Sequence, residues 1–251
     1  MTDVDSLRYS RQLALPQIGP AGQAQIAGGS ALIIGLGGLG ATAALYLGNA
    51  GVGHLVINDF DRVDATNLPR QILFTGADVG EFKTHAAAET LNRYNPELKV
   101  SILNRRLSAN ELDDAVRGCD VVLDCTDNFA TRLDINRACV DARTPLVSGA
   151  AIRFEGQLAV FNATQSGSPC YQCLYSEADE NLDDCAGQGI LAPVAGMVGC
   201  MMATEAIKLL AGLNSELVGR LWVYDGLAGT SRSLGISPNP ACPVCGKAPG
   251  P

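Results

Sequence analysis

A glycine-rich turn between an apolar run and a helix-forming segment limits what this chain can fold into more than any other feature. Residues 31–34 have the unbroken apolar character of a buried strand, and a G-x-G-x-x-G spacing follows at once. Glycines at this spacing let phosphate groups approach the backbone N–H groups at the start of a helix. Asp59 ends the next strand-like run, where an acidic residue can bind a ribose hydroxyl. The turn therefore predicts a nucleotide site formed by Asp59 and the glycines Gly35, Gly37, Gly38 and Gly40.

Segments typical of strands and helices alternate along the first 150 residues. Strands are expected at 31–34, 54–58, 99–103, 121–123 and 146–147, and helices at 41–50, 83–94, 109–117 and 129–142. This alternation predicts an α/β fold with a Rossmann-like, doubly wound and mostly parallel sheet. After Gly149 the pattern changes, and strands at 157–161 and 221–224 predict an antiparallel C-terminal extension. An acidic loop at 176–184 and a long apolar helix at 193–210 separate these two strands.

Length and composition favour one globular domain. The chain has 251 residues, of which 47% are hydrophobic and 18% charged, and this is enough to bury a core without disulfides. We divide it into an N-terminal arm (1–29), a nucleotide-binding half (30–149) and a C-terminal half (150–251). The net charge of −8 comes without a long Lys/Arg run, which argues against binding to nucleic acid. No secretory signal is visible and no apolar stretch is long enough to span a membrane, so we expect a cytoplasmic protein without membrane contact.

Polar side chains follow the predicted strands at their carboxyl ends, where ligands bind in this class of fold. Cations and amides there suit a triphosphate, and carboxylates suit Mg²⁺. The chain has no P-loop, so ATP would take its cations from this set. Its members are Asp61, Asn67, Arg70, Gln71, Lys83, Asp127 and Asn128.

The glycine turn alone leaves other functions open. It fits an NAD-dependent oxidoreductase as well, although no His or Tyr–Lys catalytic pair stands in a suitable place. A scaffold without activity is a further alternative, and the charged side chains at the predicted ligand site argue against it. Exchange of pyrophosphate with ATP would separate an ATP-dependent enzyme from both of these alternatives.

Nine cysteines divide into groups with different expected roles. Two C-x-x-C pairs offer four thiolates for a structural tetrahedral zinc site, and a redox role is the competing interpretation. These ligands are Cys170, Cys173, Cys242 and Cys245. Four others are expected in the core, and they are Cys119, Cys125, Cys139 and Cys200. Cys185 differs because it ends the acidic loop.

Several short strings carry a family resemblance. They are RYSRQ at 8–12, GLGGLG at 35–40, NLPRQ at 67–71, DCTDN at 124–128 and the two C-x-x-C pairs. Over residues 7–246 the chain resembles the MoeB/ThiF (HesA) family of adenylyltransferases, bacterial relatives of ubiquitin-activating enzymes. The resemblance implies ATP-dependent adenylation of the C-terminal Gly-Gly carboxylate of a small ubiquitin-fold sulfur carrier protein. The products are a carrier acyl-adenylate and pyrophosphate, and a sulfur donor then forms the thiocarboxylate.

The resemblance also implies roles for single residues at the nucleotide. Gly38 and Asp59 would contact the nucleotide, and Asn67, Arg70 and Lys83 would lie near its phosphates. No general base is expected, because a terminal carboxylate is already ionised.

Other implied roles involve a metal or a second protein chain. Asp127 would hold Mg²⁺ and help position the carrier's carboxylate and the α-phosphate. Family members are homodimers, and Arg11 resembles the arginine that reaches into the partner subunit's site. Zinc is expected at the four paired cysteines. In some relatives a cysteine at the place of Cys185 bonds to the carrier, but the neighbouring Asp183 and Asp184 should raise the pKa of its thiol.

The carrier itself stays open between related pathways. The string at 148–153 resembles the molybdopterin-synthase branch and favours the small subunit of that enzyme, whereas residues 67–75 resemble the thiamine thiazole branch as much. A dedicated carrier for a secondary metabolite is a further alternative. We expect no rhodanese-like domain, and therefore a separate sulfur donor protein.

Overall fold

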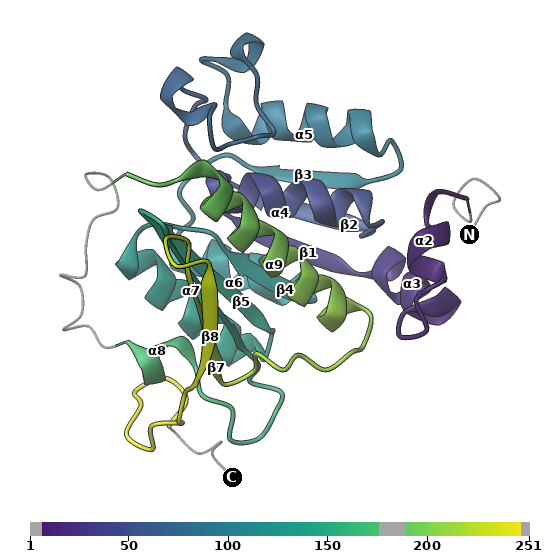
Figure 1. Cartoon of the computed structure of the whole chain (residues 1–251). Coiled ribbons are helices and arrows are strands. Elements are labelled where there is room, and N and C mark those ends of the chain that lie inside the picture. Colours follow the sequence, from purple (N-terminus) through teal and green to yellow (C-terminus); the bar gives the residue numbers. More distant parts are fainter. Residues whose placement is uncertain (1–6, 176–188, 247–251) are drawn as a thin grey trace.

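One eight-stranded sheet organises the molecule (Figure 1). The computed structural model describes residues 7–175 and 189–246. The strands lie in the order β3-β2-β1-β4-β5-β6-β7-β8. Their bounds are β1 Ser30–Ile34, β2 His54–Asn58, β3 Lys99–Leu103, β4 Val121–Asp124, β5 Leu146–Ile152, β6 Glu155–Phe161, β7 Arg220–Asp225 and β8 Thr230–Gly235.

The strand pairing changes direction halfway across the sheet. The pairs β3–β2, β2–β1, β1–β4 and β4–β5 are parallel, whereas the pairs β5–β6, β6–β7 and β7–β8 are antiparallel. The chain first adds β2 and β3 on one side of β1 and then places β4 on the other. The carboxyl ends of β1 and β4 therefore form the switch point at which open α/β sheets bind ligands. The predicted fold class, with its antiparallel extension, is confirmed.

Helices cover both faces of the sheet. On one face α4, α5 and α9 pack over a core that includes Ile33, and on the other α6 and α7 pack over a core that includes Leu32. Neighbouring residues of β1 thus serve opposite cores, as expected for a strand buried on both sides. The helices are α2 Ser10–Leu13, α3 Gly19–Gly28, α4 Gly38–Asn49, α5 Lys83–Tyr94, α6 Ala109–Arg117, α7 Phe129–Ala142, α8 Tyr171–Leu174 and α9 Ala192–Leu210, with short 3-10 turns η1 Ala65–Asn67 and η2 Gly76–Asp78.

Helix α9 is the one described helix that is long and apolar enough, by length and composition, to cross a membrane. It packs against α4, β5 and β6 instead. Val198 and Met202 of α9 are fully buried in the core on that face of the sheet. The helix is therefore a core element, as the sequence predicted.

The helices predicted at 83–94, 109–117 and 129–142 have the same bounds as α5, α6 and α7. Local signals explain this agreement. Glu111 accepts the Ser108 N–H at 2.9 Å and closes a capping box before α6, and Asn128 accepts the Thr131 N–H at 2.9 Å and caps α7. Capping side chains satisfy the free N–H groups of a helix start and so fix where it begins.

Two strands differ from the expectation. Strand β5 continues past 147 to Ile152, because it pairs with β6 over its whole length in a hairpin. The division at residues 149 and 150 falls inside this strand, so the two halves share one sheet, and the division itself stays a prediction. Strand β8 was not predicted, because all six of its residues are exposed and mostly polar. The acidic loop at 176–184 lies outside the described residues.

Candidate functional site

The glycine turn has the close backbone contacts that its spacing predicted. Gly35 has φ +90°, and a Cβ there would lie 2.8 Å from the carbonyl oxygen of Cys125, which follows β4. A Cβ on Gly40 would lie 1.9 Å from the Gly35 carbonyl oxygen. Gly37, in contrast, faces open space within 4 Å. Helix α4 begins at Gly38, so its first N–H groups open at the switch point and suit an anion.

Asp59, which directly follows β2, holds the glycine turn by hydrogen bonds. Its carboxylate accepts the Leu36 N–H at 2.7 Å and the Asp61 N–H at 2.8 Å. Burial raises the pKa of Asp59, whereas Lys83 and these two N–H groups act to lower it. A carboxylate has about four acceptor positions, so two remain for a ribose hydroxyl.

Lys83 is a buried cation beside two carboxylates. It opens α5 and is 6% exposed. Its Nζ lies 2.9 Å from Asp61 Oδ2 and 3.9 Å from Asp59 Oδ2. The structure therefore brings together three of the predicted nucleotide ligands, two from the segment that follows β2 and one from the start of α5.

Arg70 lies beside the start of α4. A Cβ on Gly38 would lie 3.4 Å from the Arg70 carbonyl oxygen and 3.6 Å from its Cγ. The Arg70 guanidinium donates to the Thr66 carbonyl at 2.9 Å. The Asn67 side chain completes the capping box of η1 with Asp64, so its oxygen already has a local donor.

Two buried oxygens in this region have no hydrogen-bond partner among the residues that the structure describes. They are Gln71 Oε1 and Thr84 Oγ1. Each residue directly follows a predicted phosphate ligand, Arg70 or Lys83, in the sequence. An unpartnered buried oxygen is costly, by about 1–3 kcal/mol, and so marks a place where a ligand contact would be favourable.

Asp127 lies on the loop between β4 and α7. The side chain is exposed and has no hydrogen bond or ion pair within the described ranges 7–175 and 189–246. A free carboxylate oxygen is a ligand that Mg²⁺ prefers. The next residue differs, because Asn128 caps α7 through its side-chain oxygen. Asn128 therefore has a structural role, and its contact with the cofactor stays a prediction.

A cavity of about 380 Å³ opens beside Asp127. Its walls come from β5, β6, α7, α8 and β7. They are mainly apolar and aromatic, with Phe129, Phe161, Tyr171 and Tyr175 among them. The cavity therefore lies next to the predicted magnesium ligand and on the α7 side of the sheet.

Arg11 lies far from the glycine turn of its own chain. Its helix, α2, is tied to the opposite end of α4, where Tyr9 packs against Gly51 and Gln12 donates to the Ala50 carbonyl at 3.0 Å. Because α4 has twelve residues, this end is about 18 Å along the helix from Gly38. Among the described residues that were predicted for the nucleotide site, Arg11 is therefore the one that the fold separates from the others.

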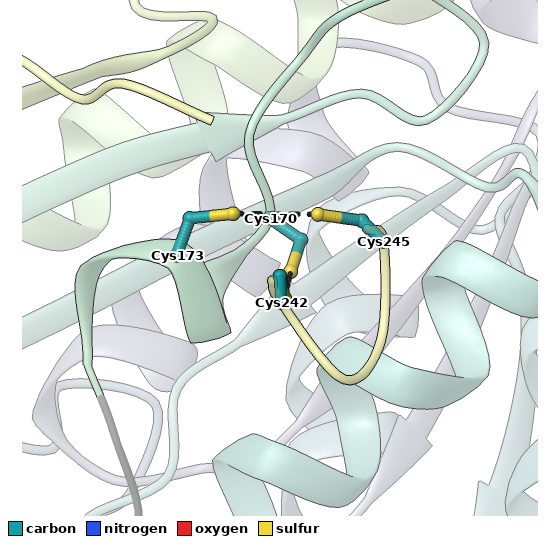
Figure 2. A group of neighbouring side chains, drawn as sticks. All are labelled: Cys170, Cys173, Cys242 and Cys245. Carbon is teal, nitrogen blue, oxygen red and sulfur yellow. Dashed lines mark hydrogen bonds between the residues drawn. The ribbon is translucent and has the colours of Figure 1, made fainter. Parts of the chain in front are cut away.

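The four paired cysteines meet at one point between α8 and the C-terminal loop (Figure 2). Their sulfur atoms all lie within 4.8 Å of one another. Cys170 and Cys242 are 3.6 Å apart, and Cys173 and Cys245 are 3.3 Å apart. Zn–S bonds of about 2.3 Å in a tetrahedron require sulfur separations of about 3.8 Å. The geometry and the donor set fit zinc.

Hydrogen-bond donors surround these sulfurs. Asn136 of α7 donates to Cys170 Sγ at 3.5 Å and accepts the Tyr171 N–H at 2.9 Å. Burial raises the pKa of Cys242, but the N–H groups of Cys245 and Val244 together with the neighbouring thiols lower it to about 7, whereas burial raises the pKa of Cys170 to about 11. Donors of this kind stabilise thiolates and orient metal ligands. Sequence reasoning missed Asn136, because a polar residue on a helix is usually exposed.

Three of the four cysteines that were expected in the core are buried there, and the fourth, Cys200, is only partly buried. Cys119, Cys125 and Cys139 are buried, and Cys200 is half-buried. Burial raises the pKa of Cys119 to about 11 and also raises those of Cys125 and Cys139, so these thiols are not activated. Cys185 lies outside the described residues.

The chain matches a known protein family and several curated proteins over almost its whole length. The sequence profile of the ThiF family matches residues 9–244. Sulfur carrier protein ThiS adenylyltransferase of Escherichia coli (strain K12) is 46% identical over 246 residues, covering 98% of this chain and 97% of that protein. Molybdopterin-synthase adenylyltransferase of the same strain is 43% identical over 247 residues, covering 98% and 99%. An adenylyltransferase and sulfurtransferase of Mus musculus is 44% identical, and the match covers 97% of this chain but 53% of that protein.

Solved structures show the same fold. The crystal structure of Escherichia coli MccB with ATP has a TM-score of 0.84 at 23% identity, covering 95% of this chain and 73% of that chain. The structure of PaaA has a TM-score of 0.82 at 22% identity, covering 95% and 76%. At such identities the likeness concerns the fold alone. The family match and the curated relatives leave the oxidoreductase alternative without support, and the chain belongs to the ThiF family.

Proposed function

We propose that this adenylyltransferase activates the C-terminal carboxylate of a small ubiquitin-fold sulfur carrier protein that ends in Gly-Gly. ATP and the carrier would give the carrier acyl-adenylate and pyrophosphate. The observation that carries the proposal is the meeting of Lys83, Asp59 and Asp61 after the carboxyl end of β2, where Asp59 accepts the Leu36 N–H of the glycine turn that leads into α4. An independent support is that two full-length relatives carry the name adenylyltransferase.

The charges at the switch point suit this reaction. Attack of a carboxylate on a phosphate brings anions together, so fixed cations and a metal must stabilise the charge that develops. Lys83 and Arg70 would supply the cations, and Gln71 and Asp59 would contact the nucleotide. Asp127 would hold Mg²⁺, which neutralises phosphate charge when bound. The carrier's carboxylate needs no base, because it is ionised at neutral pH.

Two carriers are supported by particular relatives. The small subunit of molybdopterin synthase is the main candidate, in keeping with the 43% identical molybdopterin-synthase adenylyltransferase. The thiamine thiazole carrier is the second, because the ThiS adenylyltransferase is 46% identical over the same length. The acidic net charge of −8 would repel an acidic carrier, so we expect docking to rest on apolar surface.

Pyrophosphate exchange with ATP and Mg²⁺ tests the proposal and separates the carriers. We expect exchange only with a carrier that ends in Gly-Gly, and a higher kcat/KM with the molybdopterin-synthase subunit than with the thiazole carrier. A carrier that lacks its last glycine is the control and should support no exchange. The reverse preference would assign the protein to thiamine synthesis, and no exchange with either carrier would refute the proposed reaction.

We further propose a homodimer in which Arg11 serves the partner subunit's site. Arg11 is held about 18 Å along α4 from its own glycine turn, too far to act there. Mixing inactive Arg11→Ala and Lys83→Met chains should restore activity, because about a quarter of the sites in a random mixture of symmetric dimers are intact. Dimer exchange is followed by mass and the activity by pyrophosphate exchange. If the mixture stays inactive although mixed dimers form, Arg11 does not act across the dimer.

The zinc site and the cellular setting complete the proposal. The four cysteines would hold a structural zinc, since no fifth ligand position is offered by the tetrahedral set. We also propose a cytoplasmic location, because grouped cysteines more often hold metal where thiols stay reduced, and a separate protein as the sulfur donor.

A further inference from the structure

A buried arginine that the adenylation site does not use lies beneath the loop that carries Asp127. Arg132, on α7, is 9% exposed. A buried guanidinium is expensive unless acceptors surround it. Its partners therefore show what it holds in place.

The Arg132 guanidinium donates to the main chain on both sides of the cavity. It bonds the carbonyl of Thr126, the residue directly before Asp127, and the carbonyl of Gly149 on β5 at 2.9 Å. It also donates to Ser148 Oγ at 3.4 Å. One side chain thus joins the loop after β4 to the strand that forms the opposite cavity wall.

A buried carboxylate accepts hydrogen bonds from the same loop. Asp124, the last residue of β4, is fully buried, and its Oδ2 lies 3.6 Å from the Arg132 guanidinium. Its Oδ1 accepts the Thr126 N–H at 3.1 Å and the Thr126 hydroxyl at 2.7 Å. Its Oδ2 accepts the Ser148 hydroxyl at 3.0 Å. Thr126 is therefore fixed through its N–H, hydroxyl and carbonyl at once.

We propose that Arg132 is a positioning residue that holds Asp127 at the mouth of the cavity, at a fixed place relative to Gly149. The inference rests on the proposed function, in which Asp127 holds Mg²⁺. A guanidinium suits this task because its planar fork can reach several acceptors together. Lysine keeps the charge opposite Asp124 but, as a single flexible ammonium, cannot reproduce that fork.

The variant Arg132→Lys tests the proposal in the full-length protein. We expect a folded protein whose kcat for pyrophosphate exchange falls by ~10-fold or more, because displacing a metal ligand by about 1 Å can cost that much. The Mg²⁺ concentration for half-maximal exchange should rise to a similar extent, while the KM for the carrier changes little. Binding of Mn²⁺ in the presence of ATP, followed by electron paramagnetic resonance, gives a readout that does not depend on turnover.

The matched control is Arg137→Lys on the same helix. Arg137 pairs with Asp113 and Asp141 on the outer side of α7, so its replacement should leave the metal dependence unchanged. Wild-type metal dependence and kcat in Arg132→Lys would overturn the proposal, as would an equal change in Arg137→Lys. If Arg132→Lys does not fold, the double variant Asp124→Asn/Arg132→Gln removes both buried charges and is judged by the same readouts. Lack of exchange by the wild-type protein would instead refute the proposed function itself.

Discussion

Replacing Lys83 by methionine is expected to lower the rate of pyrophosphate exchange by about 100-fold or more, the loss that follows removal of one fixed charge-stabilising group. Lys83 is a buried cation that lies beside Asp59, the residue whose carboxylate holds the glycine turn, and methionine keeps its length and apolar stem. The affinity for ATP, measured by calorimetry, should fall with the rate. The variant also leaves two carboxylates unpaired, so thermal unfolding must be measured beside the activity.

Lys99→Met is the matched control for Lys83→Met. Lys99 begins β3 and is exposed, at the end of the sheet opposite to the ligand site. Its replacement should leave exchange and ATP affinity unchanged. If Lys83→Met kept near wild-type exchange while folded, Lys83 would be a structural partner of Asp61 and not a phosphate ligand.

Replacing Cys242 by serine is expected to remove the metal from the protein and lower its thermal stability. Structural zinc binding to four thiolates contributes about 10–16 kcal/mol in small domains, and loss of one ligand forfeits much of it. In a chain of this size each lost kcal/mol lowers Tm by about 2–4 °C. Zinc per chain is measured by mass spectrometry of the metal, and Tm by calorimetry. The KM for the carrier should rise more than the KM for ATP, because α8 lines the cavity and not the glycine turn.

Cys200→Ser serves as the control for Cys242→Ser, since Cys200 is half-buried on α9 and outside the cluster. It should retain zinc and change Tm little. A Cys242→Ser protein that keeps one zinc per chain would show that the metal is held elsewhere.

Much of the parallel half of the fold could be predicted, because its signals are local. The glycine turn marks where β1 ends and α4 begins, and Pro96 directly follows Asn95, the C-cap of α5. Strand β8 could not be predicted, because its pairing with β7 decides its conformation while its exposed side chains carry no apolar pattern. The length of β5 was missed for a related reason: Ser148 and Gly149 are common in turns, and only pairing with β6 extends them.

The site residues also differ in how far the sequence alone could predict them. Asp59, Asp61 and Lys83 could be predicted to converge, because carboxyl ends of parallel strands share one edge. Arg132 could not, because an arginine on a helix is usually solvated, and its burial depends on the meeting of β4, β5 and α7. One signal was present: Asp124 ends an apolar run that begins at Val121, and a buried carboxylate requires a cation or several donors.

The short helix α8 has a consequence for the order in which the molecule is completed during synthesis. Of the four predicted zinc ligands, Cys170 directly precedes this helix and Cys173 lies within it, while Cys242 and Cys245 follow β8 in the chain. Tyr171 and Tyr175 of the same segment line the cavity. All eight strands, the last of which ends at Gly235, are therefore synthesised before Cys242 and Cys245. We expect nascent chains that end between these residues to form the sheet and the glycine turn before a metal can fix α8 at the cavity wall.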